Sequence, residues 1–352
     1  MKVIEGRTER RHCGPGSEPI STRLGRVQTE VARRPFESYE RDGGSARLSD
    51  SRFAVIIPAY NAEATLGLAL RSVSVQTRPD FEVVVVSDGS TDGTADIAMA
   101  FSSDPRFRLV CCAHRGVAAA RNAGIEESSA ELVVFLDADD LLLPTYLEEM
   151  GTLASSHAES ALFFTDAWIF DDETRRVARR TAMQANRPPR DQALMAERLF
   201  DELVGRNFVF VAATVRRSAL DVAGGFDVTL SAAADWEMWL RLAASGFGSA
   251  RSAQPLALYR RRSGQMSSDR ARMTAEITAV FDVILRTYEL SSAMRARAEA
   301  RHGRAEEEVM ALGETGHVRR RRRFDRLRRI AGRWRHWKTR VPKIISDALR
   351  EG

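Results

Sequence analysis

The sequence predicts an α/β fold, a sheet flanked by helices, followed by a helical C-terminal extension. Short apolar runs alternate with amphipathic stretches from residue 52 to residue 143, as strands alternate with helices. The run Val-Val-Val-Val at 83–86 is uninterrupted, which is typical of a parallel strand covered on both faces. With 44% hydrophobic and 29% charged residues, the 352-residue chain can bury a sizeable core, which excludes collagen-like, mucin-like and wholly disordered classes.

The first half of the predicted fold is regular. The apolar run at 53–57 predicts a strand, and the amphipathic stretch at 62–73 predicts the helix that follows it. The same alternation predicts further strands at 81–87, 107–112 and 132–136, and helices at 94–101 and 117–127. Cys111 and Cys112 fall in a predicted strand, and with Cys13 they form neither a disulfide framework nor a zinc site by spacing.

The second half is mixed. We expect a helix at 145–155, strands near 161–170 and 208–215, and a loop near 183–191. A helix is expected at 235–245, with Trp236 and Trp239 on its apolar side as core residues and Gly246 closing it. The α/β body closes near 259–266, and helical patterns follow it.

Both ends of the chain differ from this body. Residues 1–50 are rich in Arg, Glu, Ser and Gly and have no sustained period of 2 or 3.6, so we expect them to be disordered. We therefore divide the chain into a disordered segment at 1–50, an α/β domain at 51–268 and a helical, basic extension at 269–352.

The net charge of +5 hides a strong asymmetry. The segment from Arg319 to Lys343 has thirteen Lys or Arg and one acid, Asp325, a net +12, so the rest of the chain carries −7. Apolar residues recur in it at spacings of three and four, which predicts an amphipathic basic helix. Such a helix suits an anionic membrane surface. It can also pack on the body of the protein, and nucleic acid is the least favoured partner because nothing in the body resembles a reader fold.

The chain has no run of the ~20 apolar residues that would span a bilayer, and residues 1–50 have no signal-like apolar run. We therefore expect a cytoplasmic protein. If the basic segment at 319–343 binds lipid, the protein is peripheral on the inner face of the cell membrane.

Polar and acidic residues follow three predicted strands. Pro58-Ala-Tyr-Asn61 follows the first, the turn-forming stretch 87–93 the second, and Asp137-Ala-Asp-Asp140 the fourth. Ligands of open α/β sheets bind beyond the carboxyl ends of the strands. Clustered carboxylates suit Mg²⁺ or Mn²⁺, and the alternative interpretation is a plain acidic turn or a helix cap.

Together, the order and spacing of these motifs resemble family 2 glycosyltransferases. The stretches that carry the resemblance are Val55-Ile-Ile-Pro-Ala-Tyr-Asn61, Val83-Val-Val-Val-Ser-Asp-Gly-Ser-Thr-Asp92, Ala120-Arg-Asn-Ala-Gly124 and Phe135-Leu-Asp-Ala-Asp-Asp140. The resemblance covers residues 52–268 and is strongest before Met150. It implies a GT-A type, Rossmann-like mixed sheet flanked by helices that binds a nucleotide-diphosphate sugar, with a UDP-sugar favoured.

The resemblance also implies roles for single residues. Tyr60 would lie against the base, Asp88 would accept a hydrogen bond from the base edge, and Arg121 would contact base or phosphate. Asp137 would reach the ribose or a metal-bound water, and Asp139 would coordinate the Mn²⁺ or Mg²⁺ ion that bridges the diphosphate. The full donor-binding set is Pro58, Tyr60, Asn61, Asp88, Arg121, Asp137 and Arg262.

A later segment, Ala234-Asp-Trp-Glu-Met-Trp-Leu-Arg241, resembles the family's Glu-Asp-Trp-Asp-Leu-Trp-Leu-Arg pattern. The second acid of that pattern serves as general base, a role that maps onto Asp235. Without the resemblance, Asp235 is interpreted as a helix N-cap or first-turn acid. Glu237 precedes Arg241 by four residues, which favours a surface ion pair.

Three positions depart from the family pattern. Ala234 replaces the first acid of the later motif, and Ser87 replaces the first acid of the usual Asp-Asp-Gly-Ser. Arg262 stands where many relatives carry a His after Tyr-Arg. Because guanidinium pairs bidentately with phosphate oxygens, Arg262 would clamp the diphosphate directly.

The resemblance therefore implies a metal-dependent, inverting, hexosyltransferase-like glycosyltransferase that acts on a glycan or lipid-linked acceptor in polysaccharide biosynthesis. The alternative enzyme is a sugar nucleotidyltransferase, which would need a Gly-rich phosphate loop with a basic residue after the first strand, and Pro58-Ala-Tyr-Asn61 does not supply one. The alternative from another class is a non-catalytic, membrane-associated scaffold. Four acids argue against it: Asp88, Asp137, Asp139 and Asp235.

Overall fold

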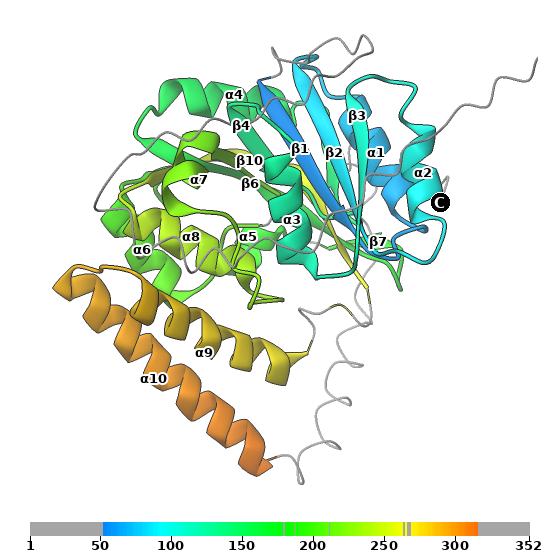
Figure 1. Ribbon diagram of the computed structural model, residues 1–352. Coiled ribbons are helices and arrows are strands. Elements are labelled where there is room, and N and C mark those ends of the chain that lie inside the picture. Colours follow the sequence, from blue (N-terminus) through cyan, green and yellow to red (C-terminus); the bar gives the residue numbers. More distant parts are fainter. Residues whose placement is uncertain are drawn as a thin grey trace, which may run out of the picture.

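The computed structural model describes residues 52–315, apart from 179, 187, 211, 263–264 and 266–268 (Figure 1). Two predictions concern residues outside this part of the chain: the disordered segment at 1–50 and the basic helix at 319–343. Among the described helices, none combines the length and the hydrophobicity that crossing a membrane requires.

In the described residues, ten strands form one mixed sheet. Its order is β3-β2-β1-β4-β9-β6-β10-β5, with β7 paired to β6 and β8 to β10. The strands are β1 Phe53–Ala59, β2 Phe81–Asp88, β3 Phe107–Cys112, β4 Leu132–Phe135, β5 Leu141–Leu142, β6 Ser160–Asp171, β7 Arg176–Val177, β8 Ala193–Leu194, β9 Ala213–Arg216 and β10 Gly248–Arg261.

The strand directions bring six carboxyl ends to one edge of the sheet. β1 runs parallel to both of its neighbours, β2 and β4, and β3 runs parallel to β2. β9 is antiparallel to β4 and to β6, so β6 has the direction of β4, and β10 is parallel to β6. The chain therefore delivers the residues after β1, β2, β3, β4, β6 and β10 to the same edge, where α/β sheets bind ligands.

Helices cover both faces of this sheet (Figure 1). They are α1 Leu66–Ser74, α2 Thr94–Ala100, α3 Val117–Glu126, α4 Tyr146–Ser156, α5 Ala182–Asn186, α6 Ala196–Gly205, α7 Arg217–Ala223, α8 Ala234–Ala244, α9 Arg270–Thr287 and α10 Ser292–Thr315. Side chains of β1 alternate between the faces: Val55 and Ile57 pack with α1 and α4, whereas Ile56 packs with α3, α6 and α8. On α3, Gly124 allows a close approach, because a Cβ there would clash with Ile56.

The regular half of the fold follows the sequence closely, and the mixed half does not. The strands β1 to β4 and the helices α2 to α4 lie where the pattern predicts them. α1 begins at Leu66 instead of residue 62, because residues 61–63 are held by contacts with the loop after β2. The strand predicted at 208–215 is shorter than expected, because only β9 forms there. The loop predicted at 183–191 begins within α5, and the sequence did not predict α6 or α7.

Helix α8 ends as predicted. Gly246 has a φ of 92°, its N–H donates to the carbonyl of Ala243 at 3.1 Å, and the N–H of Phe247 donates to the carbonyl of Leu242 at 3.1 Å. These two bonds are those of a Schellman motif, in which glycine adopts the left-handed conformation without steric cost.

The interior of α8 corrects one prediction and confirms another. The ion pair between Glu237 and Arg241 forms, with 2.8 Å between Oε2 and Nη2, but it is buried and not on the surface. Arg241 also donates to the carbonyls of residues 223, 224 and 225, which explains why its charge is tolerated inside the protein. Trp236 and Trp239 are buried core residues, as predicted.

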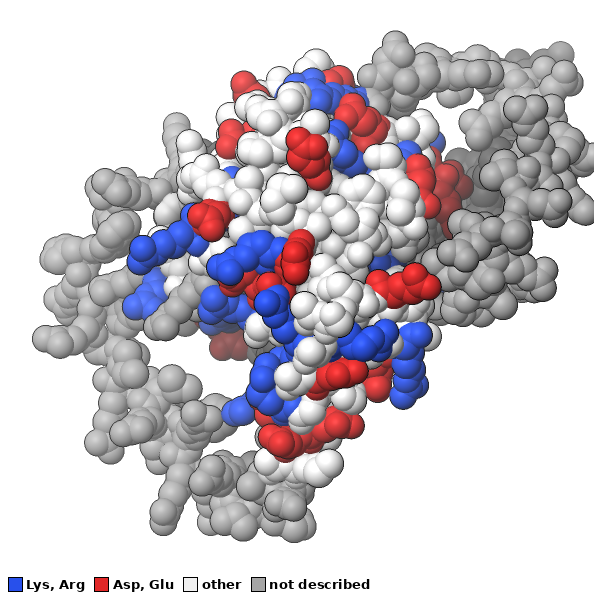
Figure 2. All heavy atoms as spheres, turned by 90° about the vertical axis from the view of Figure 1, so that its left-hand side faces the viewer, with Lys and Arg blue, Asp and Glu red and all other residues white. Residues whose placement is uncertain are grey.

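The helical extension packs on the α/β body. Phe281 of α9 is fully buried and lies edge-on to the Trp236 ring, with 5.9 Å between the ring centroids. α10 packs along α9 and also contacts α6. On the side of the molecule shown in Figure 2, acidic and basic side chains are interspersed over the described surface.

Candidate functional site

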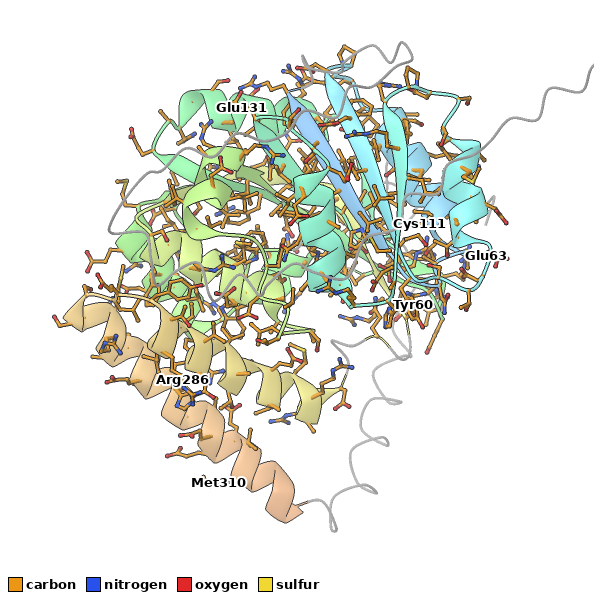
Figure 3. All side chains as sticks on the ribbon, in the orientation of Figure 1. Tyr60, Glu63, Cys111, Glu131, Arg286 and Met310 are labelled. Atoms are coloured by element: carbon orange, nitrogen blue, oxygen red, sulfur yellow. The ribbon has the colours of Figure 1, made fainter. Side chains whose placement is uncertain are left out.

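The residues after β1 are fastened to the loop after β2. Figure 3 places Tyr60 and Glu63 at the edge of the sheet opposite Glu131, which precedes β4. Asn61, whose φ is 48°, accepts a hydrogen bond from the Thr91 N–H at 2.9 Å, and Glu63 accepts one from the Gly93 N–H at 2.8 Å. The Asn61 side chain is thereby occupied within the loop, Pro58 is buried inside β1, and Tyr60 is half exposed.

Asp88, at the end of β2, is buried and holds the loop after β3. Its carboxylate accepts hydrogen bonds from the N–H groups of Arg115, at 2.8 Å, and Gly116, at 2.9 Å. His114 Nδ1 lies 3.0 Å from the same carboxylate, and its ring stacks on Tyr60 with 4.1 Å between centroids. Gly89 leaves room for this arrangement, since a Cβ at position 89 would lie only 2.7 Å from the backbone nitrogen of His114. No motif in the sequence pointed to His114.

Arg121 is a buried residue of α3. Its Nη2 donates to Asp137 Oδ1 at 2.7 Å, and its Cζ lies 5.1 Å from the centroid of the Phe226 ring. Asn122 fixes Phe226 from the next position along α3, because its side-chain amide exchanges two hydrogen bonds with the Phe226 backbone. The pair Arg121–Asp137 thus joins α3 to the loop after β4.

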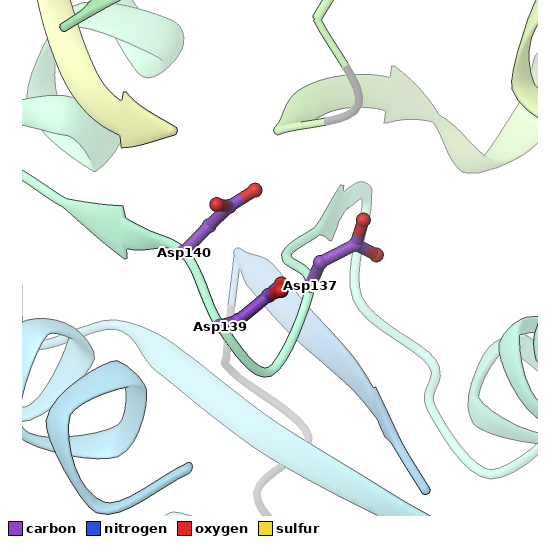
Figure 4. Close-up of side chains that lie close together, drawn as sticks. All are labelled: Asp137, Asp139 and Asp140. Atoms are coloured by element: carbon purple, nitrogen blue, oxygen red, sulfur yellow. The ribbon is translucent and has the colours of Figure 1, made fainter. Parts of the chain in front are cut away.

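Three carboxylates converge after β4. Asp137, Asp139 and Asp140 each offer an oxygen, and these atoms lie within 4.8 Å of one another (Figure 4). Burial raises the pKa of Asp139, with a further rise from the charge of Asp137. Burial and the two neighbouring acids raise the pKa of Asp140 well above its ordinary value. A divalent cation would relieve this repulsion.

Asp140 shows that these residues fit a hard metal ion. It is fully buried, its Oδ1 accepts from the Arg260 N–H at 2.9 Å, and its Oδ2 has no hydrogen-bond partner in the described part of the chain. A buried carboxylate oxygen without a partner is costly unless a ligand completes it. The family resemblance implies Asp139 as the metal ligand and gives Asp140, the last residue of the same acidic motif, no role of its own.

Two arginines from the end of β10 face this cluster. The Arg262 Nη2 lies 3.1 Å from Asp139 Oδ2, and about half of its side chain is exposed. Arg260 is buried, donates from Nε to the carbonyl of Asp139 at 3.1 Å and pairs with Asp172 at 2.8 Å. Arg262 therefore lies beside the proposed metal ligand, and Arg260 supports the backbone of the loop that carries it.

Asp235 lies in the first turn of α8. Its Oδ1 accepts from the Trp236 N–H at 2.7 Å, and its Oδ2 accepts from Asn207 Nδ2 at 3.3 Å. Burial raises the pKa of Asp235 to about 6, against the opposing charge of Arg121. A carboxyl with a pKa near neutrality is suited to take up a proton in a reaction.

The start of α8 is held by α9. The N-cap residue, Ala233, has no side chain that can cap the helix. Glu276 of α9 accepts from the N–H groups of Ser231, at 3.0 Å, and Ala232, at 3.1 Å, and also from the Ser231 hydroxyl. The position of Asp235 thus depends on α9, a helix that comes after the last strand in the sequence.

Comparisons with known proteins identify the relatives of this chain. The family model described as "Glycosyl transferase family 2" matches residues 54–222. A "PGL/p-HBAD biosynthesis glycosyltransferase" of Mycobacterium bovis is 31% identical over 194 residues, which cover 54% of this chain and 68% of that protein. The chain belongs to glycosyltransferase family 2. Its matches to an uncharacterized glycosyltransferase of Escherichia coli, 38% identical, and a putative glycosyltransferase of Bacillus subtilis, 36% identical, span only 31% of the length of those proteins.

Solved structures confirm the GT-A type fold expected of this family. Staphylococcus aureus TarS 1-349 in complex with UDP-GlcNAc has a TM-score of 0.60 at 21% identity and covers 76% of each chain. The mannosyltransferase PcManGT from Pyrobaculum calidifontis, in complex with GDP-Man and Mn²⁺, has a TM-score of 0.51 at 18% identity and covers 85% of this chain and 82% of the other.

Proposed function

We propose that this family 2 member transfers a sugar from a nucleoside-diphosphate sugar to a hydroxyl of a glycan or lipid-linked acceptor, with inversion and with a divalent metal. The observation that carries the proposal is that a cluster of acidic residues and a separate carboxyl group with a raised pKa both belong to the site. Three carboxylates converge within 4.8 Å after β4, and the charge of Arg121, which pairs with one of them, Asp137, also acts on Asp235, whose pKa is raised to about 6. The structures similar in fold, TarS and PcManGT, hold UDP-GlcNAc and GDP-Man.

The donor would lie along the edge formed by the ends of β1, β2 and β4. In this proposal, Tyr60 and Asp88 face the base, and Arg121 reaches base or phosphate. The remaining donor-binding residues are Pro58, Asn61, Asp137 and Arg262. A UDP-sugar remains the favoured donor.

Asp139, with Asp137 and Asp140 beside it, would hold the metal ion, Mn²⁺ or Mg²⁺. When bound, such an ion neutralises the diphosphate as it leaves. Arg262 would add a guanidinium to the same diphosphate, since it already lies 3.1 Å from Asp139.

Asp235 would act as the general base. As the acceptor oxygen forms a bond to the anomeric carbon, the hydroxyl proton passes to the Asp235 carboxylate and the bond to the diphosphate breaks. A single displacement of this kind inverts the anomeric centre. A positioned base contributes ~10²–10⁴-fold to the rate.

The proposal is tested by binding and hydrolysis of UDP-GlcNAc, GDP-Man and other nucleotide sugars by the full chain, with and without Mn²⁺. We expect metal-dependent binding of one donor in the wild type and its loss in Asp139→Asn. The matched control is Asp104→Asn, since Asp104 lies at the opposite edge, before β3, paired with Arg106. Pyrophosphate release from a nucleoside triphosphate would favour the sugar nucleotidyltransferase, and a folded wild type that binds no nucleotide would favour the scaffold.

The division into a GT-A domain at 51–268 and an extension at 269–352 is part of the same proposal. So is an anionic membrane surface as partner of the basic segment at 319–343, which would place the chain peripherally on the inner face of the cell membrane and suit a lipid-linked acceptor. Co-sedimentation with vesicles of phosphatidylglycerol, against vesicles of phosphatidylcholine alone, tests it. Equal binding to both would contradict it.

A further inference from the structure

Asn207 lies in a stretch where the sequence shows no motif, directly after α6. Its side chain is partly buried and bridges two groups. Oδ1 accepts from the Val209 N–H at 3.2 Å, and Nδ2 donates to Asp235 Oδ2 at 3.3 Å. Because a backbone N–H can only donate, the bond to Val209 fixes which end of the amide is oxygen, and the NH₂ end must face Asp235.

We propose that Asn207 is a positioning residue that holds the carboxylate of Asp235 in place for proton transfer. The inference rests on the proposed function, in which Asp235 is the general base. The N–H of Trp236 binds one oxygen of Asp235 and Asn207 binds the other, so the carboxylate is fixed from two sides. A carboxylate has about four lone-pair sites. Two remain for the acceptor hydroxyl.

A neutral donor suits this task better than a cation would. Asn207 fixes the carboxylate without adding a positive charge that would depress its basicity. The charged groups that act on Asp235 from the neighbouring elements are Arg121 of α3, which lowers its pKa, and Asp137 after β4, which raises it. The hydrogen bond from Asn207 also favours the ionised form, so its loss leaves Asp235 harder to ionise.

The test is Asn207→Asp in the full chain, compared with Asn207→Ala. Aspartate has the same shape and keeps an oxygen for the Val209 N–H, but it places a carboxylate oxygen against Asp235. We expect the kcat of donor hydrolysis, with water as acceptor, to fall about 10- to 100-fold at pH 7, less than the ~10²–10⁴-fold that loss of the general base itself would cost. The KM for the donor and the dissociation constant of UDP or GDP should change less than twofold.

The pH profile separates positioning from packing. In Asn207→Asp, the rise of kcat/KM with pH should move to higher pH by about one unit, and in Asn207→Ala by less. The matched control is Gln192→Glu, the same amide-to-acid change at an exposed position, which should leave activity and profile unchanged.

Three results would overturn the inference: an unchanged kcat in Asn207→Asp, an unshifted profile in both variants, or a loss of nucleotide binding equal to the loss of kcat. If Asn207→Asp does not fold, the profile of Asn207→Ala decides alone. A wild type that turns over a donor, together with an inactive Asp235→Asn and a normal Asn207→Asp, would refute this inference and leave the proposed function standing. A wild type that binds no donor would refute both.

Discussion

Tyr60, Asp88 and Asp137 lie at or just beyond the end of a strand and are held by the loop after β3 or by α3. Asp235, by contrast, lies in the first turn of a helix, is held by Asn207, and follows residues that Glu276 holds. We call the first group the strand side of the site and the second the helix side. On the strand side, the sheet delivers each residue to the edge by strand order alone. On the helix side, α6, α8 and α9 must pack correctly before the carboxylate has its partners.

The difference teaches where function should be most sensitive to distant change. Changes on the strand side should alter donor and metal binding, because those residues would contact the ligand. Changes on the helix side should alter turnover without altering donor binding, since they move only the proposed base.

The largest expected effect is that of Asp235→Asn. We expect kcat to fall ~10²–10⁴-fold while UDP or GDP still binds, as measured by donor hydrolysis and calorimetry. The folded-state pKa of Asp235, about 6, lies above its ordinary value, so the carboxylate, which is mostly ionised at pH 7, lowers the stability of the folded protein relative to the unfolded chain. The variant should therefore melt higher than the wild type at pH 7. If Asp235→Asn also lost nucleotide binding, the division between a strand side that binds donor and a helix side that does not would be wrong.

Next in size is the buried pair on α8. Glu237→Gln leaves Arg241 without its partner in the core, and breaking such a pair costs about 3–5 kcal/mol. Urea unfolding measures it. The control is Glu202→Gln, which breaks a pair with Arg198 at the same spacing but with an exposed arginine, and should cost less than about 1 kcal/mol. Similar costs in both variants would contradict the burial of Arg241.

The pH dependence of turnover is a smaller effect that concerns the helix side. Because Asp235 must be ionised to accept a proton and its pKa is about 6, kcat/KM should rise about tenfold per unit below pH 6 and level off above pH 7. Initial rates at constant ionic strength between pH 5 and 8 check this. A plateau that already begins at pH 5 would exclude Asp235 as the base.

The smallest expected effect belongs to the strand side. Arg262→Ala should raise the donor KM several-fold, because a guanidinium beside the diphosphate is lost, and should strengthen Mn²⁺ binding without donor, because Asp139 is freed of its cation. Steady-state kinetics and Mn²⁺ titration measure the two. Arg261→Ala, an exposed neighbour, serves as control, and equal KM values in both variants would remove Arg262 from the donor site.

The two sides also differ in how much of them could be predicted from the sequence. The strand side was largely predictable, because each motif follows an apolar run and the order of the runs defines the sheet. The buried position of Asp140 was not predicted, because it depends on contact with the backbone of Arg260, 120 residues away. The place of His114 in the site was not predicted, because its contacts with Tyr60 and Asp88 exist only once three strands are aligned.

On the helix side, spacing predicted the Glu237–Arg241 pair but not its burial, since a spacing of four fixes neighbours on a helix and not what covers them. Asn207 and Glu276 gave no signal at all. Their partners are defined by packing between helices that the hydrophobic pattern did not separate.

The clasp between Glu276 and the residues before α8 matters for anyone who shortens this chain. Truncation just before α9 would preserve every described strand and the family motifs. It would nevertheless delete the Glu276 carboxylate that accepts hydrogen bonds from Ser231 and Ala232, and it would uncover Trp236, on which Phe281 packs. The shortened protein would carry a fresh apolar patch and tend to self-associate. Its loss of turnover could then be mistaken for the removal of a catalytic residue.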